Sequence, residues 1–187
     1  VLKPSYKYSC SRGYYYTRNL KLGCHTHRSP LNLTEAVMMS CNAYFCHVMR
    51  NVLEQGDNID KSFDKWREYV LSFGFGAPLG SDFPSELGGN IPTSKYYDKL
   101  YGKNRWKFSN IVSLSVGQGE IGATPLQIAN LAAIMANRGW YKIPHIVRDP
   151  SPHFTEKHYT MVDSTHFSEV VDGMWLAVNA GWGSGGT

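Results

Sequence analysis

The sequence predicts a mostly α-helical fold with short strands or hairpins. Apolar residues recur at the spacing of an amphipathic helix in four segments, residues 34–55, 60–73, 124–137 and 165–178. One short segment, residues 111–116, alternates apolar and polar side chains as a strand does. No internal repeat or low-complexity tract interrupts this pattern. We therefore expect a fold assembled mainly by packing helices against one another.

The composition fits a folded protein that does not bind nucleic acid. The 187 residues suit one ordinary domain or a piece of a larger one. Hydrophobic residues make up 42% and charged residues 18%, which excludes a disordered chain. The net charge of +4 comes from scattered Lys and Arg, which favours a solvated basic surface over a nucleic-acid site. We expect no membrane span and no export signal within these residues.

The first 33 residues are predicted to be irregular. They are rich in Tyr, Cys, His, Pro and Gly, and they show no sustained period of a strand or a helix. A segment of this kind buries too little apolar surface to hold itself together. We therefore expect short hairpin structure that a crosslink attaches to the rest of the chain.

The first predicted helix covers residues 34–55. Thr34 is a suitable N-cap, and Glu35 places an acidic side chain in the first turn. The helical spacing of apolar residues continues until Gly56, which ends the pattern. This predicted helix contains the tripeptide Ser40-Cys41-Asn42.

Two further helices and a long connection follow. Residues 60–73 share an apolar face, and Gly74 provides a C-terminal stop. Residues 74–108 carry most of the Gly and Pro and are predicted to form a long loop, which is often functional. Thr124 and Pro125 suit the N-cap and first position of a helix that runs to about residue 137.

The last third of the chain is predicted to hold an extended segment and one more helix. Residues 140–147 read as extended and are broken by Pro144. Residues 165–178 place Phe167, Met174 and Val178 on one helical face. The Gly-rich end of the sequence is predicted to be a loop.

The cysteines and histidines permit three interpretations. Four cysteines are present, and two histidines follow the second of them closely: Cys10, Cys24, Cys41, Cys46, His25 and His27. The thiols are buried hydrophobic groups, or they form disulfides in an oxidising compartment, or some of them bind zinc. A tetrahedral zinc site made of Cys10, Cys24, one of the two histidines and Cys41 would give residues 1–33 the crosslink that they need. Cys46 lies five residues after Cys41, about 140° around a helix, and is predicted to belong to the core instead.

One long block of the sequence, residues 113–139, contains Gly117-Gln118-Gly119 and Thr124-Pro125. This block resembles the class B penicillin-binding proteins, and within them the penicillin-binding protein 2 group, the D,D-transpeptidases of cell elongation. Shorter similarities lie at Leu31-Asn32-Leu33, residues 73–76, Asn90-Ile91-Pro92 and Val178-Asn179. The resemblance covers nearly all of the chain.

The resemblance assigns roles to the tripeptide. Penicillin-binding transpeptidases carry the motifs SxxK, SxN and KTG, and Ser40-Cys41-Asn42 matches the second. It implies that Ser40 takes part in proton relay and that Asn42 hydrogen-bonds the acyl donor. No KTG occurs in the sequence, and Ser62-Phe63-Asp64-Lys65, the one SxxK, follows the SxN motif instead of preceding it. We therefore interpret this SxxK match as a coincidence and expect this chain alone to be inactive toward penicillin.

The resemblance also assigns the metal ligands. Some members of the family carry zinc beside the SxN motif, with a Cys in the middle of that motif. The corresponding positions here are Cys10, Cys24, His27 and Cys41, with His25 as the substitute for His27. The expected cofactor is one structural Zn²⁺.

The same resemblance implies an architecture and a setting. Residues 1–187 are expected to form a single partial transpeptidase domain, with a metal-binding segment over 1–33 and a helical lobe over 34–187. The resemblance implies that this lobe belongs to the α/β penicillin-binding transpeptidase (serine β-lactamase-like) fold, and the central sheet of that fold is expected to be largely missing from this chain. The implied ligands are peptidoglycan stem peptides and β-lactams, with cell-elongation proteins as partners. The implied location is the periplasmic side of the inner membrane, through an anchor outside this sequence.

Two other classes of protein remain open. A zinc-stabilised extracytoplasmic binding module would hold a protein partner on exposed aromatic residues such as Tyr14, Tyr15 and Tyr16. A disulfide-stapled extracellular domain would pair Cys10 or Cys24 covalently.

Overall fold

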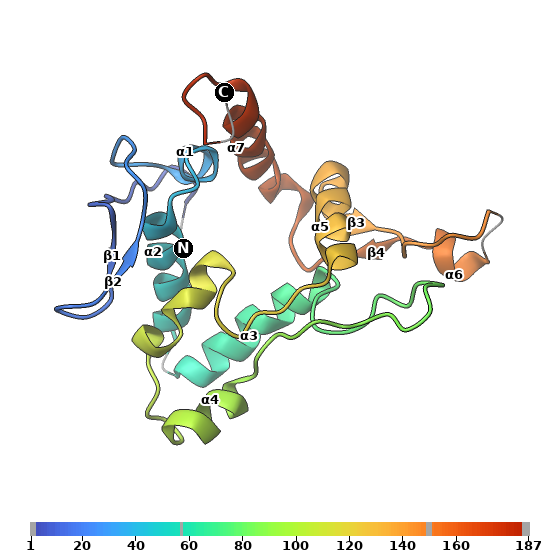
Figure 1. Ribbon diagram of the computed structural model, residues 1–187, viewed down its shortest axis with the longest axis horizontal. Helices are drawn as coiled ribbons and strands as arrows, with labels where there is room; N and C mark the ends of the chain where they lie inside the picture. The colour runs from blue at the N-terminus through green and yellow to red at the C-terminus, as the bar shows by residue number, and fades with distance from the viewer. Residues whose placement is uncertain (1–2, 57, 149–150, 185–187) are drawn as a thin grey trace.

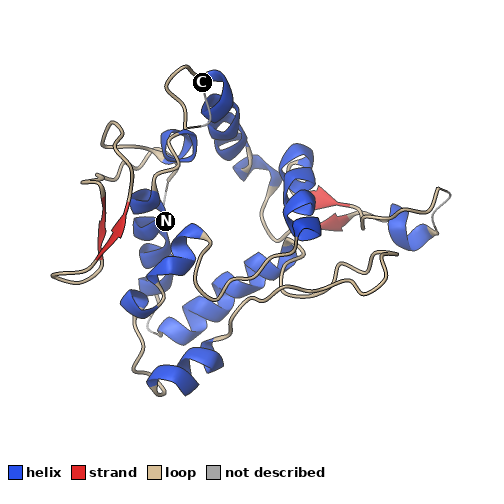
Figure 2. Cartoon of the chain, in the orientation of Figure 1, coloured by secondary structure: helices blue, strands red, loops and turns tan. Residues whose placement is uncertain are grey.

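The computed structural model describes residues 3–56, 58–148 and 151–184, and it is mostly helical, as predicted (Figure 1). Two small antiparallel sheets lie at opposite sides of the helices (Figure 2). The α-helices are α1 (Leu33–Met38), α2 (Asn42–Glu54), α3 (Ile59–Ser72), α4 (Ser94–Tyr101), α5 (Pro125–Asn137), α6 (Pro152–Thr155) and α7 (Ser168–Asn179). The 3-10 helices are η1 (Phe108–Asn110), η2 (Val112–Val116) and η3 (Ser164–His166).

The two sheets are short hairpins. Strands β1 (Gly13–Tyr15) and β2 (Lys21–Gly23) pair with Tyr14 opposite Leu22. Strands β3 (Trp140–Tyr141) and β4 (His158–Tyr159) pair with Trp140 opposite Tyr159. The irregular N-terminal segment thus contains the hairpin that its composition predicts, and the extended segment after residue 140 supplies one strand of the second.

The single helix predicted over residues 34–55 is wrong, because the helix breaks between α1 and α2. Helix α1 ends at Met38 and α2 begins at Asn42, and Ser40 between them has a left-handed φ of +50°. The N-cap of α1 is Asn32, whose side chain accepts from the Glu35 N–H at 3.0 Å while the Glu35 carboxylate accepts from the Asn32 N–H. This capping box could have been read from the sequence, since its acid stands three residues after its cap.

Two more sequence predictions need correction. Residues 111–116 form no strand, because Ile111 and Leu114 are buried one 3-10 turn apart and η2 occupies the segment. The long loop over residues 74–108 contains the unpredicted helix α4, which Thr93 caps by accepting from the Tyr96 N–H at 3.2 Å. Its Lys- and Tyr-rich sequence hides the helical pattern. The helices predicted over 60–73, 124–137 and 165–178 are present, and their ends differ from the prediction by at most three residues.

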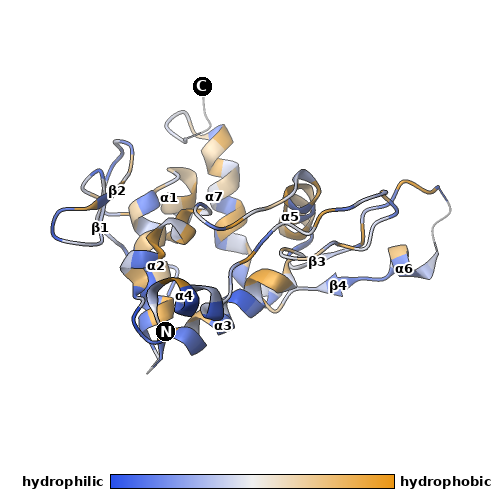
Figure 3. Cartoon of the chain, turned by 60° about the horizontal axis from the view of Figure 1, so that its bottom comes forward, coloured by the Kyte–Doolittle hydropathy of each residue, from blue (hydrophilic) through white to orange (hydrophobic). Residues whose placement is uncertain are grey.

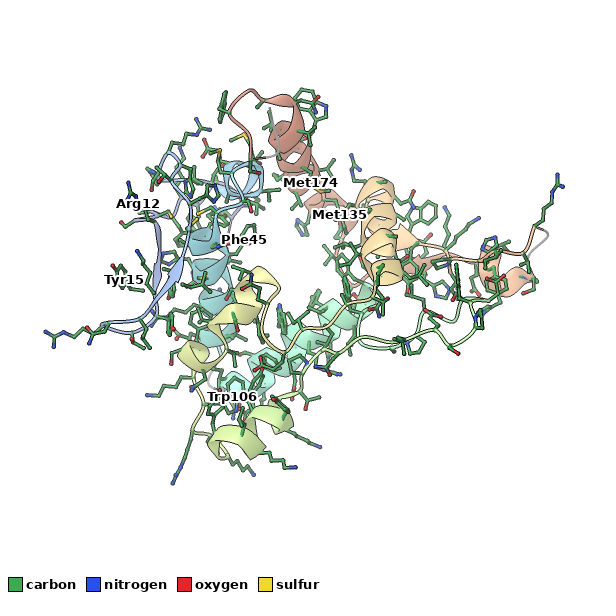
Figure 4. All side chains as sticks on the ribbon, viewed as in Figure 1. Arg12, Tyr15, Phe45, Trp106, Met135 and Met174 are labelled. Carbon is green, nitrogen blue, oxygen red and sulfur yellow. The ribbon has the colours of Figure 1, made fainter. Side chains whose placement is uncertain are left out.

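The main core joins α2, α3, α4 and the 3-10 segment. Phe63 of α3 is fully buried and lies edge-to-face against Tyr97 at 5.5 Å and Trp106 at 5.5 Å between ring centroids. Trp106 lies where α3 and α4 meet (Figure 4). Each aromatic side chain buries about 150–250 Å², so this cluster supplies a large share of the apolar surface that holds the helices together.

Helix α7 returns to pack directly on α1, far from it in sequence (Figure 1). Gly173 makes this close approach possible. A Cβ atom at that position would lie 2.7 Å from the Thr34 carbonyl oxygen and 2.7 Å from the Val37 Cβ. The segment after α7 continues this contact, because the Ser184 N–H donates to the Met38 carbonyl at 3.0 Å.

Helices α5 and α7 are rich in apolar residues (Figure 3), and several of these side chains are exposed. Met135 of α5 and Met174 of α7 line one hollow between the two helices (Figure 4). Trp175 and Val178 are exposed by 62% and 67% on α7, and Ile128 by 53% on α5. Within the described residues, no helix has the length and apolar character needed to cross a bilayer.

Gln127 of α5 holds the long loop in place. Its side chain is fully buried, and the two hydrogens of Nε2 are shared among the carbonyls of Gly74, Ala77 and Gly88 at 3.0, 3.0 and 2.9 Å. Its Oε1 accepts from the Thr124 N–H at 3.0 Å as part of a capping box. One side chain therefore joins the start of α5 to three points of the loop.

We expect Gln127→Leu to lower the free energy of unfolding by about 2–3 kcal/mol, because it leaves the loop carbonyls buried without donors. Urea denaturation followed by circular dichroism measures the change. The control is Gln118→Leu at an exposed position, which should stay within about 0.5 kcal/mol of the parent chain. Equal losses from both variants would contradict this role for Gln127.

Candidate metal centre and SxN tripeptide

The structure brings Cys10, Cys24, His27 and Cys41 together. Their sulfur and nitrogen atoms all lie within 4.8 Å of one another. The Cys24 Sγ lies 3.4 Å from the His27 Nε2. Ligands about 2.3 and 2.0 Å from one tetrahedral zinc ion would lie about 3.5 Å apart, so this spacing fits a metal site. Three thiols and one imidazole can thus hold a metal ion here.

The first hairpin brings two of these residues side by side. Cys10 lies just before β1, and Cys24 follows β2 directly. The Cys24 N–H donates to the Arg12 carbonyl at 3.1 Å, and the Cys10 N–H donates to the Ser29 hydroxyl at 2.8 Å. Pairing of the strands therefore sets the distance between the two thiols before any metal binds.

His27 is oriented by its own chain. Its Nδ1 lies 2.6 Å from the Arg28 carbonyl oxygen, which can only accept, so Nδ1 carries the proton. The Nε2 lone pair then points at the cysteines, and the same bond fixes the ring, as in many metal-binding histidines. His25 is exposed, with its ring centroid 5.2 Å from that of His27, and it lies outside the cluster.

Cys41 is the buried member of the cluster. Burial raises the pKa of its thiol to about 12, and the neighbouring Cys10 and Cys24 oppose a further negative charge. The Tyr44 N–H donates to its sulfur at 3.4 Å and partly offsets this effect. A cation at the centre would reverse the balance, because it stabilises thiolates directly. None of the four cysteines is in a disulfide, and Cys46 is buried in the core and is not one of the four clustered residues.

The tripeptide forms the junction between two helices. Ser40 and Cys41 donate their N–H groups to the carbonyls of Val37 and Ala36 at 3.1 and 2.9 Å, which is the pattern of a Schellman motif. Cys41 is also the N-cap of α2. A Ser in the left-handed region is uncommon, and such strain occurs often at functional sites. Ser40 is exposed, while Cys41 is buried beside it.

Asn42 makes a contact that the sequence does not predict. Its side-chain amide donates to the Gly23 carbonyl at 2.9 Å, one residue before Cys24. The start of α2 therefore meets the end of β2 twice. Asn42 bonds Gly23, and the adjacent residues Cys41 and Cys24 lie together in the cluster. The Asn42 Oδ1 has no hydrogen-bond partner among the described residues.

Arg28 connects the loop that carries His27 to α1 and to the segment after α7. Its guanidinium donates to Glu35 at 2.9 Å and lies over the Trp182 ring, 4.3 Å from the centroid. Glu35 belongs to the capping box of α1, and Trp182 follows α7. The loop that carries His27 is thus joined to both helices of the α1–α7 pair. No pattern in the sequence identifies this contact.

Aromatic rings attach the hairpin to α2. His47 stacks on Tyr8 at 4.8 Å between centroids and meets Tyr14 edge-on at 4.8 Å. Asn51 donates to the Tyr8 hydroxyl at 2.7 Å, and Arg50 donates to the Tyr14 hydroxyl at 3.2 Å. The inward-facing tyrosines of the N-terminal segment are therefore part of the core surface that supports the metal cluster.

The whole chain, residues 1–187, matches the family model of the penicillin binding protein transpeptidase domain, and the chain belongs to this family. Within the family, it is similar to proteins of the penicillin-binding protein 2 type. The peptidoglycan D,D-transpeptidase MrdA of Acinetobacter baumannii is 35% identical over 118 residues, which cover 63% of this chain and 16% of that protein. The chain therefore spans about a sixth of that relative's length.

Solved structures share the fold. Penicillin-binding protein 2 of Pseudomonas aeruginosa matches 98% of this chain and 40% of its own with a TM-score of 0.77 and 24% identity. The Helicobacter pylori complex of penicillin-binding protein 2 and MreC matches 98% of this chain and 32% of its own with a TM-score of 0.76 and 21% identity. The expected lobe of the penicillin-binding transpeptidase fold is confirmed.

Cys41→Ser should release a metal bound at the cluster and lower the melting temperature, because it removes the ligand that joins the N-terminal loop to α2. Cys46→Ser provides the matched control: it replaces a buried thiol of the same helix outside the cluster and should retain the metal. Elemental mass spectrometry after gel filtration measures bound zinc, and calorimetry measures melting. Equal metal loss from the two variants would refute the ligand assignment.

Proposed function

We propose that the chain is part of a peptidoglycan D,D-transpeptidase of cell elongation and that a structural zinc ion braces its SxN tripeptide. The observation that supports this most strongly is the position of Cys41. Its sulfur belongs to the four-residue cluster, and its backbone joins Ser40 to Asn42. A metal at the cluster would therefore fix the tripeptide through the buried Cys41 side chain.

Zinc is the metal that this donor set favours. Three thiolates with one imidazole suit the tetrahedral, closed coordination of structural Zn²⁺, in which no position remains for a reacting water. Cys10, Cys24, His27 and Cys41 would hold it, with His27 oriented through Arg28. The bound ion supplies folding free energy to a segment with little core of its own. It takes no part in the acyl transfer.

Ser40 and Asn42 form one wall of the catalytic cleft in this proposal. The Ser40 hydroxyl is exposed and has no hydrogen-bond partner among the described residues, so it is available to relay a proton. Asn42 uses one amide hydrogen on Gly23 and keeps its Oδ1 for the amide of an acyl donor. The bond to Gly23 fixes the orientation of that amide before substrate arrives.

The nucleophile and the KTG strand come from elsewhere in the longer protein. Ser62 and Lys65, the residues of the SxxK match, lie on α3, where Lys65 pairs with Glu68 at 3.1 Å and is largely exposed. No hydrogen bond joins Ser62 to Lys65 within the described chain, so this pair lacks the contact that activates a nucleophile. We therefore propose that the chain alone does not react with penicillin.

The remaining segments of the transpeptidase would also cover the exposed face of α5 and α7. In this proposal, residues 1–187 are one partial domain, with the metal-binding segment over 1–33 and the helical lobe over 34–187. The central sheet of the fold would pack on Met174, Trp175 and neighbouring apolar groups, whose exposure is otherwise costly. The large apolar side chains on these helices support that arrangement.

The setting and partners follow from the relatives. We propose a location on the periplasmic side of the inner membrane, with peptidoglycan stem peptides as substrates and β-lactams as inhibitors of the longer protein. Cell-elongation proteins such as MreC, which one structural neighbour binds, are the proposed partners. A zinc-stabilised binding module is less well supported, because Tyr14 is buried and only Tyr15 is strongly exposed among Tyr14, Tyr15 and Tyr16.

The test uses the full-length transpeptidase that carries these residues. Asn42→Ala should slow acylation by a fluorescent penicillin on the order of 100-fold, because it removes a positioned group from the cleft. Asn19→Ala, at an exposed position of the first hairpin, is the matched control and should leave acylation unchanged. Acylation of the Asn42 variant at the parent rate would remove Asn42 from the site.

A further inference from the structure

A polar cavity lies between α3, the start of α4 and the segment before α5, and it shares no residue with the metal cluster. It has a volume of about 540 Å³, within the range of small-molecule sites. Its lining combines a cation, an anion and neutral polar groups over an apolar floor: Arg67, Glu120, Asn90, Thr93, Tyr96 and Ile91. None of these residues belongs to the cluster or to the SxN tripeptide.

Arg67 is held in place without being neutralised. Its Nε donates to the Ile91 carbonyl at 3.2 Å, which fixes the guanidinium on the cavity wall. Asp64 lies one turn earlier on α3, but its two oxygens accept from the N–H and the hydroxyl of Ser94 at 3.3 and 2.8 Å. Within the described chain Arg67 forms no ion pair, so its positive charge is free to meet a ligand.

Glu120, the acidic residue of the cavity, is also held by hydrogen bonds and forms no ion pair within the described chain. Its Oε2 accepts from the Tyr97 hydroxyl at 3.0 Å, and its backbone carbonyl accepts from the Asn90 amide at 2.6 Å. Burial raises the pKa of Tyr97 far above its ordinary value, so the phenol stays protonated and remains a donor. The second carboxylate oxygen of Glu120 has no partner among the described residues, and no Lys or Arg neutralises it there.

We propose that this cavity binds a zwitterionic amino-acid or short peptide group, with its carboxylate on Arg67 and its ammonium on Glu120. Two opposite charges that line one cavity and do not pair with each other favour a ligand carrying both signs. The amino terminus of α4 lies on the Thr93 side and favours the carboxylate there. Ile91, which is 4% exposed, and the ring of Tyr96 offer apolar contact to the ligand side chain.

The probes are alanyl-alanine, which carries both charges, and two analogues that each lack one. N-acetyl-alanyl-alanine keeps the carboxylate, and alanyl-alanine amide keeps the ammonium. Titration into the ¹⁵N-labelled chain should move the backbone amides of Asn90 and Thr93. Each analogue should bind at least about tenfold more weakly than the dipeptide, since each loses a charged hydrogen bond. These arms use the unaltered chain and do not depend on any variant folding.

Two variants assign the charges to residues. Glu120→Gln should weaken alanyl-alanine binding about tenfold and leave binding of N-acetyl-alanyl-alanine unchanged. Arg67→Gln should also weaken alanyl-alanine binding about tenfold and leave binding of alanyl-alanine amide unchanged. Lys65→Gln removes a positive charge from the same helix but lines a different cavity, and it should change nothing. The proposal fails if alanyl-alanine leaves the Asn90 and Thr93 amides unmoved, or if the blocked analogues bind as tightly as it does. Neither result bears on the metal centre or the transpeptidase assignment.

Discussion

The contact of Cys41 with the Cys10, Cys24 and His27 side chains is the constraint on which the N-terminal half of the structure depends. Among the described residues 3–32, the only strands are two of three residues each, and this segment packs on α2 through a few aromatic rings. The cluster places both ends of this hairpin beside Cys41, the N-cap of α2. A metal ion there would convert a weakly held segment into a fixed part of the lobe.

The same cluster is connected to Ser40 and Asn42, the proposed catalytic residues, by the backbone and by one hydrogen bond. Ser40 and Asn42 flank the buried Cys41 directly, and the Asn42 amide reaches back to Gly23 beside Cys24. Arg28 joins the His27 loop to the capping acid of α1 and to Trp182 after α7. The hairpin, the helix junction and the segment after α7 are therefore connected by direct contacts.

The sequence was sufficient for the helical class, three of the helices and the choice of residues that the structure brings together in the cluster. It was insufficient where long-range contacts decide the local conformation. The periodicity of residues 34–55 continues through Ser40, so it conceals the break at which Ser40 adopts a left-handed conformation. Helix α4 and the Gln127 contacts also escape detection, because the partners of Tyr97 and Gln127 include Glu120 and the Gly74 carbonyl, which lie 23 and 53 residues away in the sequence.

The most direct test of this account is zinc X-ray absorption spectroscopy on the chain purified without chelators. The account predicts about one equivalent of zinc in a four-coordinate shell of three sulfurs at about 2.3 Å and one nitrogen at about 2.0 Å. Less than half an equivalent of zinc, or a coordination shell of oxygen and nitrogen alone, would contradict it.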